Sequence, residues 1–428
     1  MITRRTMFGA LAGTTLLTVP GLLRAFEFPS EPMTIQIWWH EFGPLTAYMN
    51  ELIAAYQGLH PNIRIESVVV SSGDLNQKLT VALATGTGPH IIDNDASFFG
   101  LYYSKGLLDP LNLDVFGTAD YQGIQDLYTP GGLDAATFDG KVYALPFQAN
   151  SMSLFINNKE FAAAGLDPVA DAPKTWEDMI ALGPKLKITE GSRTVQKAFD
   201  FPYHSPRWEL QLFQPLVEQF GGRLLAEDGV TVAANSEAAV KALTLWRDVT
   251  RVTGDPRTTM NVSSAPNQDF LDGRTAMWTT GPWATPQIHA SAIGEDFTVV
   301  SYPQLDPQNP RTILYGFMWA VNSSKPDAEK AVAWDFIRFM LSKPEEWIAK
   351  VGFLQPLKGV AETEVAKNFP FFAVHMKDIE TGSWYVRSEF TNEISQAIGR
   401  AIERTVYDDV DPQASLDQAQ SEIERAIR

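Results

Sequence analysis

The stretch "MTIQIWWHEFGPLTAYMNELIAAYQG", residues 33–58, decides the fold class, because its hydrophobic period changes once along its length. Its first six residues form a short apolar run of the kind that makes a buried strand. After Pro44, the apolar residues Leu45, Met49, Leu52 and Tyr56 recur at the spacing of one helix face. The stretch therefore predicts a strand followed directly by an amphipathic helix.

The same alternation continues over the next residues. "NIRIESVVV" (62–70) has strand periodicity, "GDLNQKLTVALATG" (73–86) has helical periodicity, and "HIIDND" (90–95) is typical of a third strand. Strand, helix, strand, helix, strand in this order predicts parallel strands joined by right-handed crossovers. We expect an α/β fold.

Polar and aromatic residues stand at the ends of the three predicted strands. They are Trp38, Trp39, His40 and Glu41, then Ser71, Ser72, Gly73 and Asp74, then Asp93, Asn94 and Asp95. Ligands of parallel sheets bind beyond the carboxyl ends of the strands, so these residues are candidates for a binding site. The serine and aspartate groups have an alternative role, since Ser and Asp also cap the helices that follow.

Further strand and helix patterns indicate a second lobe. "SMSLFIN" (151–157) is a predicted strand, and "TAMW" (275–278) is another, followed by a glycine-proline turn and a helix start. "ILYGFMWAVNSSKPDAEKAVAWDFIRFMLS" (313–342) predicts one more strand and a long amphipathic helix. No repeat of fixed period is visible, which excludes a repeat protein.

Composition limits the function. The 428 residues suffice for two lobes, and 51 acidic against 34 basic side chains give a formal charge of -17. This charge disfavours nucleic acid as a partner. The chain has no cysteine, which excludes thiol catalysis, disulfides and thiolate metal sites.

The first 25 residues predict export. A basic start at Arg4 and Arg5 precedes a weakly apolar run that ends near Ala25. The arginine pair resembles a twin-arginine signal, and we expect cleavage near Ala25 and a periplasmic location. An uncleaved membrane anchor is the alternative, but the run contains glycines, threonines and a proline.

The order of several motifs resembles the substrate-binding proteins of ABC importers, in the family with maltodextrin- and multiple-sugar-binding members. The motifs are "GTGPHIID" (86–93), "YALPFQANSMSLFIN" (143–157), "GRTAMWTTGPW" (273–283) and "VGFLQPLKGVA" (351–361). The resemblance implies a two-lobed periplasmic-binding-protein fold, each lobe a mostly parallel sheet flanked by helices, with ligand in the cleft between lobes. It implies lobes of 33–144 plus 311–356 and of 145–310 plus 357–428, a monomer, and permease subunits as partners.

The resemblance also implies a set of ligand-binding residues. Carried onto this sequence they are Trp39, His40, Glu41, Ser71, Ser72, Asp93, Asp95, Gln148, Asn150, Ser151, Trp208, Gly281, Trp283, Tyr315, Gly316 and Arg387. Trp283 would be a stacking platform just after the glycine-proline turn. Sugars alternate apolar faces with hydroxyl edges, so aromatic rings beside carboxylates and amides suit a carbohydrate.

Two other functions stay open. Glu41, Asp93 and Asp95 could serve an exported glycoside hydrolase, which needs two carboxylates about one bond. His40 with Asp93 and Asp95 could hold a metal, although no His-x-x-x-His spacing supports one. We expect a binding protein without catalytic residues, metal or cofactor. The default ligand is a neutral oligosaccharide or glycoside, but His40, Arg207 and Arg387 could also face an acidic sugar.

Overall fold

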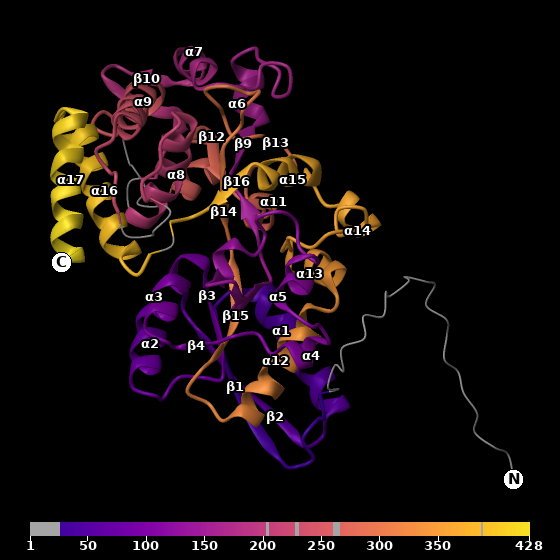
Figure 1. Ribbon diagram of the computed structural model, residues 1–428. Coiled ribbons are helices and arrows are strands. Elements are labelled where there is room, and N and C mark those ends of the chain that lie inside the picture. The colour runs from indigo at the N-terminus through magenta and orange to yellow at the C-terminus, as the bar shows by residue number, and fades with distance from the viewer. Residues whose placement is uncertain (1–25, 203–204, 227–230, 260–265, 387) are drawn as a thin grey trace, which may run out of the picture.

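The computed structural model describes residues 26–202, 205–226, 231–259, 266–386 and 388–428, and it divides into two α/β lobes (Figure 1). Arg4, Arg5 and Ala25 lie outside the described residues, as does Arg387. The indigo to purple part of the chain and the orange helices α12 and α13 build one lobe (Figure 1). The magenta part and the yellow helices α16 and α17 build the other. The predicted two-lobed fold class is confirmed.

The first lobe is organised around a six-stranded sheet of order β2-β1-β3-β15-β4, with β7 also paired to β15. Its strands are β1 (Met33–His40), β2 (Ile63–Val70), β3 (Ile91–Asp95), β4 (Leu108–Asp109), β7 (Ala144–Pro146) and β15 (Phe317–Asn322). β1 pairs in parallel with β2 and β3, as the sequence predicts. The carboxyl ends of β1 and β3 therefore meet at one edge of the sheet.

Helices and short elements complete this lobe. They are α1 (Gly43–Leu59), α2 (Ser72–Ala84), η1 (Ala96–Phe98), α3 (Phe99–Ser104), α4 (Leu113–Phe116), α5 (Tyr121–Gln125), η2 (Asp134–Ala136), β5 (Thr137–Phe138), β6 (Lys141–Val142), α12 (Asp327–Leu341) and α13 (Pro344–Val351). α1 buries Leu45, Met49, Leu52 and Tyr56, the face that the helical spacing predicts.

The second lobe has a five-stranded sheet of order β10-β11-β12-β9-β13. Its elements are β9 (Ser153–Asn157), α6 (Asn158–Ala163), α7 (Trp176–Leu186), β10 (Ile188–Glu190), β11 (Arg193–Asp200), α8 (Pro206–Gln219), α9 (Glu237–Gly254), α10 (Pro266–Leu271), β12 (Thr275–Thr280), η3 (Pro282–Ala284), α11 (Thr285–His289), β13 (Phe297–Val300), α16 (Thr391–Tyr407) and α17 (Pro412–Ile427). α8 packs between α9 and α16, and one apolar cluster connects these helices with the sheet.

Strand direction corrects one part of the prediction, because neither sheet is mostly parallel. β15 runs antiparallel to β3, β4 and β7, and β9 runs antiparallel to β12 and β13. The chain enters β15 from the other lobe rather than through a crossover helix, so it arrives at the opposite end of the sheet. The parallel β1-β2-β3 unit is the part that crossover rules govern.

The lobes join where extended segments cross. A small third sheet lies at this crossing and consists of β8 (Asn150–Ser151), β14 (Thr312–Tyr315) and β16 (Gly382–Trp384). The helix α15 (Phe372–Glu380) packs against β8 and β14, and α14 (Glu364–Lys367) packs against α15. At Gly316, between β14 and β15, an added Cβ would lie 1.9 Å from the carbonyl oxygen of Gln148. Only glycine allows this close crossing of two backbones. The exact domain boundaries stay a prediction.

A buried polar cluster fixes α15 against these crossing strands. Ser153 Oγ donates to Asp378 Oδ2 at 2.7 Å and lies 3.2 Å from His375 Nδ1, and the amide of Tyr302 donates to the same carboxylate at 3.3 Å. Burial raises the pKa of Asp378 to about 7 and lowers the pKa of His375 to about 4. The cluster is therefore most favourable with Asp378 protonated and His375 neutral.

The raised pKa of Asp378 predicts a pH dependence of stability. A carboxyl whose folded pKa exceeds its unfolded value stabilises the fold fully at low pH, and that contribution is lost as pH rises from about 4 through about 7. Asp378→Asn removes this loss. We expect the unfolding free energy of the variant, relative to the unmodified protein, to increase between pH 5 and pH 8 by about 3 kcal/mol.

Denaturant unfolding at several pH values measures the difference in unfolding free energy between Asp378→Asn and the unmodified protein. Because both proteins contain His375, the titration of His375 cancels from this difference. Asp178, whose pKa is lowered in a helix-capping pair with Thr175, is the matched control. For Asp178→Asn the difference should stay constant above pH 5. A constant difference for Asp378→Asn as well would show that Asp378 is ionised at no cost in the folded protein.

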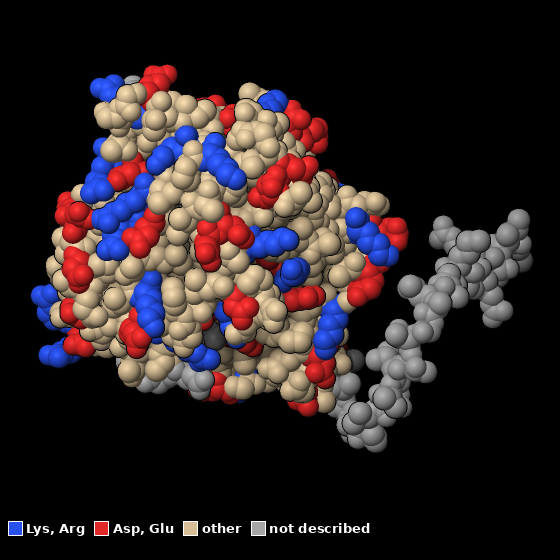
Figure 2. Space-filling model, turned by 90° about the horizontal axis from the view of Figure 1, so that it is seen from above, with Lys and Arg blue, Asp and Glu red and all other residues tan. Residues whose placement is uncertain are grey.

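The surface carries charges of both signs. On the face shown in Figure 2, Lys and Arg side chains are interspersed with Asp and Glu side chains. Among the described residues, no helix combines the length and apolar character needed to cross a membrane.

Candidate functional site

Three aromatic side chains predicted from the sequence come together between the lobes. Trp208 lies in the first turn of α8, Trp283 lies in η3 after β12, and Tyr315 ends β14. Their ring centroids are 6.1 Å apart for Trp208 and Trp283, 5.8 Å for Trp208 and Tyr315, and 5.4 Å for Trp283 and Tyr315. All three are half-buried, so they can present apolar ring surface to a ligand. We call them the aromatic cluster.

Gly281 sets the position of the Trp283 ring. An added Cβ at Gly281 would lie 1.9 Å from Cζ3 of Trp283, so the indole lies directly over the glycine backbone. Pro282 follows in the first turn of η3 and fixes the direction of the chain. The turn formed by Gly281 and Pro282 therefore fixes the orientation of the Trp283 ring.

Polar groups from the first lobe border the aromatic cluster. His40, at the end of β1, lies with Nδ1 2.6 Å from Asp93 Oδ2, and the His40 amide donates to the same oxygen at 2.9 Å. The imidazole ring stacks on the Phe317 ring with their centroids 4.0 Å apart, and the centroids of the Phe317 and Tyr315 rings are 5.7 Å apart. Adjacent parallel strands thus bring together His40 and Asp93, which are far apart in the sequence.

Asp95 links the two lobes. Its Oδ1 accepts hydrogen bonds from the Ser97 amide at 2.9 Å and the Ser97 hydroxyl at 2.5 Å. The Arg207 guanidinium of the second lobe lies 2.5 Å from the same oxygen. Burial raises the pKa of Tyr315 and of Tyr385, and the Asp95 carboxylate raises both further. Asp95 therefore belongs to the same site as the aromatic cluster.

Several buried polar atoms at this site have no hydrogen-bond partner among the described residues. They are Asp93 Oδ1, Asp95 Oδ2, Gln148 Oε1, and both side-chain polar atoms of Asn150 and of Gln355. The strand register places Asn150 beside Tyr315, and Asp95 beside Phe317. An unpaired buried polar atom is unfavourable by about 1–3 kcal/mol, so such a group of them indicates a site that a polar ligand or water completes.

Trp39 lies elsewhere. It is 0% exposed in the apolar core of the first lobe, on the same face of β1 as Ile35 and Ile37. Side chains two residues apart in a strand share a face, so Trp39 follows these two isoleucines into the core. Its indole has no free surface for a ligand, and Trp39 is not part of the candidate site.

Other predicted residues of the first lobe lie outside the aromatic cluster. Glu41 is exposed, and its amide donates to the Val70 carbonyl at 2.7 Å. Ser71 is the N-cap residue of α2, and its side chain hydrogen-bonds Asp74. Ser71 therefore occupies the N-cap position, but its side chain makes no capping hydrogen bond to a helix amide. The Ser72 side chain is outside the described set.

The remaining predicted residues lie at the crossing between lobes. Ser151 donates to the His375 carbonyl at 3.2 Å, so its hydroxyl is engaged in the α15 cluster. Gly316 forms the close backbone crossing with Gln148, and its carbonyl accepts from the Ala96 amide at 3.0 Å. Arg387 lies outside the described residues.

Comparison with known proteins places this architecture in a family. The family described as bacterial extracellular solute-binding protein matches residues 51–373. The chain belongs to this family. Its members are substrate-binding proteins, so this solute-binding protein shares a family with exported proteins that capture ligands outside the cytoplasm.

Individual relatives are distant but cover most of the chain. A putative binding protein of Brucella abortus is 25% identical over 379 residues, which are 86% of this chain and 85% of the relative. A maltotriose-binding protein of Pyrococcus abyssi is 22% identical over 345 residues, 78% of this chain and 68% of the relative.

Solved structures with the same fold are equally distant in sequence. The cyclic α-maltosyl-1,6-maltose binding protein from Arthrobacter globiformis has a TM-score of 0.77 at 22% identity, covering 92% of this chain and 99% of that one. The sugar-binding protein MalE from Xanthomonas citri has a TM-score of 0.77 at 18% identity, covering 92% and 97%. These structural similarities show that this solute-binding protein has the same two-lobed fold.

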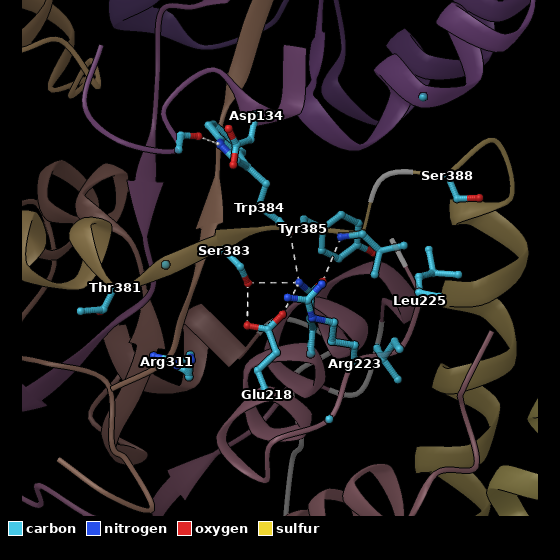
Figure 3. A pocket seen from close by; sticks show the side chains of 18 of the residues that line it. Asp134, Glu218, Arg223, Leu225, Arg311, Thr381, Ser383, Trp384, Tyr385 and Ser388 are labelled. Atoms are coloured by element: carbon cyan, nitrogen blue, oxygen red, sulfur yellow. Dashed lines mark hydrogen bonds between the residues drawn. The ribbon is translucent and has the colours of Figure 1, made fainter. Parts of the chain in front are cut away.

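A cavity of about 1230 Å³ lies between the lobes (Figure 3). α3 and residues 131–139 line one wall, and the end of α8, residues 221–226, residues 308–311 and the segment around β16 line the other. Among the described residues that the family resemblance suggests as ligand contacts, its lining includes Tyr385 alone. Ser383 Oγ donates to Glu218 Oε2 at 2.6 Å, and Gln214 Nε2 donates to Glu218 Oε1 at 2.9 Å. These polar groups satisfy one another, whereas unpaired polar atoms border the aromatic cluster, which is therefore the candidate ligand site.

Sequence reasoning did not identify Phe98 and Phe317, and it placed Gln355 in a segment linking the lobes without predicting that it contacts ligand. Phe98 lies under the Arg207 guanidinium, with Cζ 5.1 Å from the ring centroid. Phe317 and Gln355 follow the crossing positions 316 and 354, where the chain passes between lobes. Their proximity to the crossings, which the family motifs mark, is the signal that could have identified the last two.

Proposed function

We propose that this solute-binding protein is the periplasmic substrate-binding component of an ABC importer that binds a carbohydrate between its lobes. The sugar ring packs on Trp283, beside Trp208 and Tyr315, and its hydroxyls pair with Asp93 and Asp95. The lobes close on the sugar, and the closed complex delivers it to the membrane permease. The names of the relatives, which bind maltotriose or cyclic maltosyl-maltose, support a carbohydrate.

One observation carries the proposal: buried, unpaired carboxylate and amide atoms border a cluster of half-buried aromatic rings. Each sugar hydroxyl can donate to an unpaired oxygen and accept from an unpaired amide group. The apolar face of the sugar ring meanwhile covers aromatic surface. A purely apolar ligand would leave the polar atoms unpaired, and an ion would leave the rings uncovered.

Hinge closure follows from how the lobes connect. The crossing segments near Gln148, Gly316 and Gln355 are short and adjacent, since the Ala149 amide donates to the Leu354 carbonyl at 2.7 Å. Arg207 and Asp95 come from opposite lobes, so their ion pair exists only when the lobes are close together. A ligand that contacts both lobes favours the closed state by the contacts that only this state allows.

Catalysis is the alternative, because the site contains carboxylates. One oxygen of Asp93 accepts a hydrogen bond from the His40 amide. One oxygen of Asp95 accepts a hydrogen bond from Ser97 and forms an ion pair with Arg207. A glycoside hydrolase needs one carboxyl that is protonated to serve as an acid. Both carboxyls are instead fixed by protein contacts through one oxygen, as suits groups that hold a ligand in place. We therefore propose binding without turnover, and unchanged ligand recovered after long incubation supports it.

Thermal unfolding against a ligand panel tests the proposal. The panel contains monosaccharides, maltotriose, mannotriose and α-D-tagatose, with amino acids and dipeptides as the control set. A ligand at a hundredfold its dissociation constant should add about 2.7 kcal/mol of stability. We expect stabilisation by at least one carbohydrate. Stabilisation by members of the control set alone would contradict a carbohydrate ligand.

A further inference from the structure

Arg207 occupies an unfavourable position for helix stability. It is the second residue of α8 (Pro206–Gln219), where the helix dipole presents its positive end. A cation in the first turn of a helix is destabilising, while an acidic residue there is favourable. The position of Arg207 therefore needs a reason other than helix stability.

Its contacts supply that reason. The guanidinium reaches from the second lobe to Asp95 Oδ1 of the first lobe at 2.5 Å and lies 5.1 Å from the ring centroid of Phe98. The Tyr385 hydroxyl donates to the Arg207 carbonyl at 3.3 Å, which holds the backbone in place. Burial lowers the pKa of Arg207, but the Asp95 carboxylate outweighs burial and the pKa is raised overall. Arg207 is thus a permanent cation beside Asp95.

Asp95 has one oxygen fully used and one unused. Oδ1 accepts from the Ser97 amide and hydroxyl and forms an ion pair with the Arg207 guanidinium, whereas Oδ2 has no partner among the described residues. Asp95 is 1% exposed, so its unused oxygen is held in a fixed direction and is shielded from bulk water. At Asp95 the ligand therefore meets one acceptor oxygen, on a carboxylate whose charge Arg207 already balances.

We infer that Arg207 is a specificity-determining residue, which balances the charge of Asp95 so that Oδ2 receives a neutral sugar hydroxyl rather than a protonated amine. The inference rests on the proposed function, because it concerns the ligand of the same site. A carboxylate without Arg207 would attract an ammonium group strongly, whereas a charge-balanced carboxylate attracts it much less. Asp93 is bonded to His40 rather than to Arg207, so its effect on the ligand cancels when Arg207 variants are compared.

Removal of Arg207 should therefore change the ligand preference. The probes are glucose with glucosamine, mannose with mannosamine, and maltotriose with the glucosamine trisaccharide, at slightly acidic pH where the amines are protonated. For each pair, isothermal titration gives the ratio of the affinity for the amino sugar to the affinity for the neutral sugar. Arg207→Met should raise this ratio at least tenfold.

Three variants separate this effect from a loss of structure. Arg207→Lys keeps the charge and should keep the ratio of the unmodified protein within about threefold, because one ammonium also balances Asp95. Asp95→Asn combined with Arg207→Met removes both charges and should restore the ratio. Arg223→Met, on an exposed arginine after α8, is the matched control and should leave the ratio unchanged.

The outcomes distinguish this inference from the proposed function. If the unmodified protein binds no carbohydrate, the proposed function fails, and the role of Arg207 fails with it. If the unmodified protein binds sugar but Arg207→Met leaves the ratio unchanged, only the role of Arg207 is contradicted. A ratio raised in both Arg207→Met and the double variant would mean that Arg207 excludes amines without acting through Asp95, which also overturns the inference.

Discussion

Replacing Trp39 with alanine should lower the free energy of unfolding by about 3 to 5 kcal/mol and leave the sugar affinity of the folded protein unchanged. Trp39 is 0% exposed and belongs to the core of the first lobe. Its indole nitrogen donates to Thr46 Oγ1 at 3.4 Å, so truncation leaves both a cavity and an unpaired hydroxyl. Denaturant unfolding measures the loss, and calorimetry under native conditions measures the affinity.

Trp38 provides the matched control on the same strand. It lies on the opposite face of β1 and is only half-buried, so Trp38→Ala should be clearly less destabilising than Trp39→Ala. A Trp39→Ala protein that unfolds normally but binds sugar weakly would restore the stacking role that the sequence alone suggests.

Replacing Trp283 with alanine should weaken sugar binding about tenfold to a hundredfold, which corresponds to roughly 1 to 3 kcal/mol. The half-buried indole over Gly281 offers apolar surface to the ligand, and alanine removes almost all of it. Stability should change less than for Trp39→Ala, because Trp283 is not a fully buried core residue. Calorimetric titration and thermal unfolding on one preparation separate the two effects.

Trp278 is the matched control for Trp283. It lies on β12 just before the same turn, is half-buried, and packs against Phe155 and Phe270 rather than between the lobes. Trp278→Ala should reduce stability and leave affinity unchanged. Equal affinity losses in the two variants would mean that the turn as a whole, and not the Trp283 ring, supports binding.

Local patterns predicted the first lobe well. The predicted strand at 33–38, the helix that buries Leu45, Met49, Leu52 and Tyr56, and the strands around 62–70 and 90–95 all correspond to elements of the structure. These segments have strong hydrophobic periods and clear ends, which is the information that a sequence carries locally. The predicted strands at 151–157 and 275–278 likewise correspond to β9 and β12.

Side-chain direction and long-range pairing were harder to predict. The alternation of Ile35, Ile37 and Trp39 already indicated one shared face, but the pair of tryptophans at the strand end was interpreted as a unit. The Arg207 to Asp95 ion pair depends on how two lobes approach each other, which no local pattern records. The antiparallel entry of β15 depends on the crossing near Gly316 for the same reason.

A crystal structure of the protein with the most strongly stabilising sugar of the panel tests the central claim most directly. We predict that a sugar ring packs on the face of Trp283 and that its hydroxyls donate to Asp93 Oδ1 and Asp95 Oδ2, the carboxylate oxygens without a described partner. A sugar bound in the cavity beside Glu218 and Ser383, with the aromatic cluster uncovered, would contradict the assignment of the site.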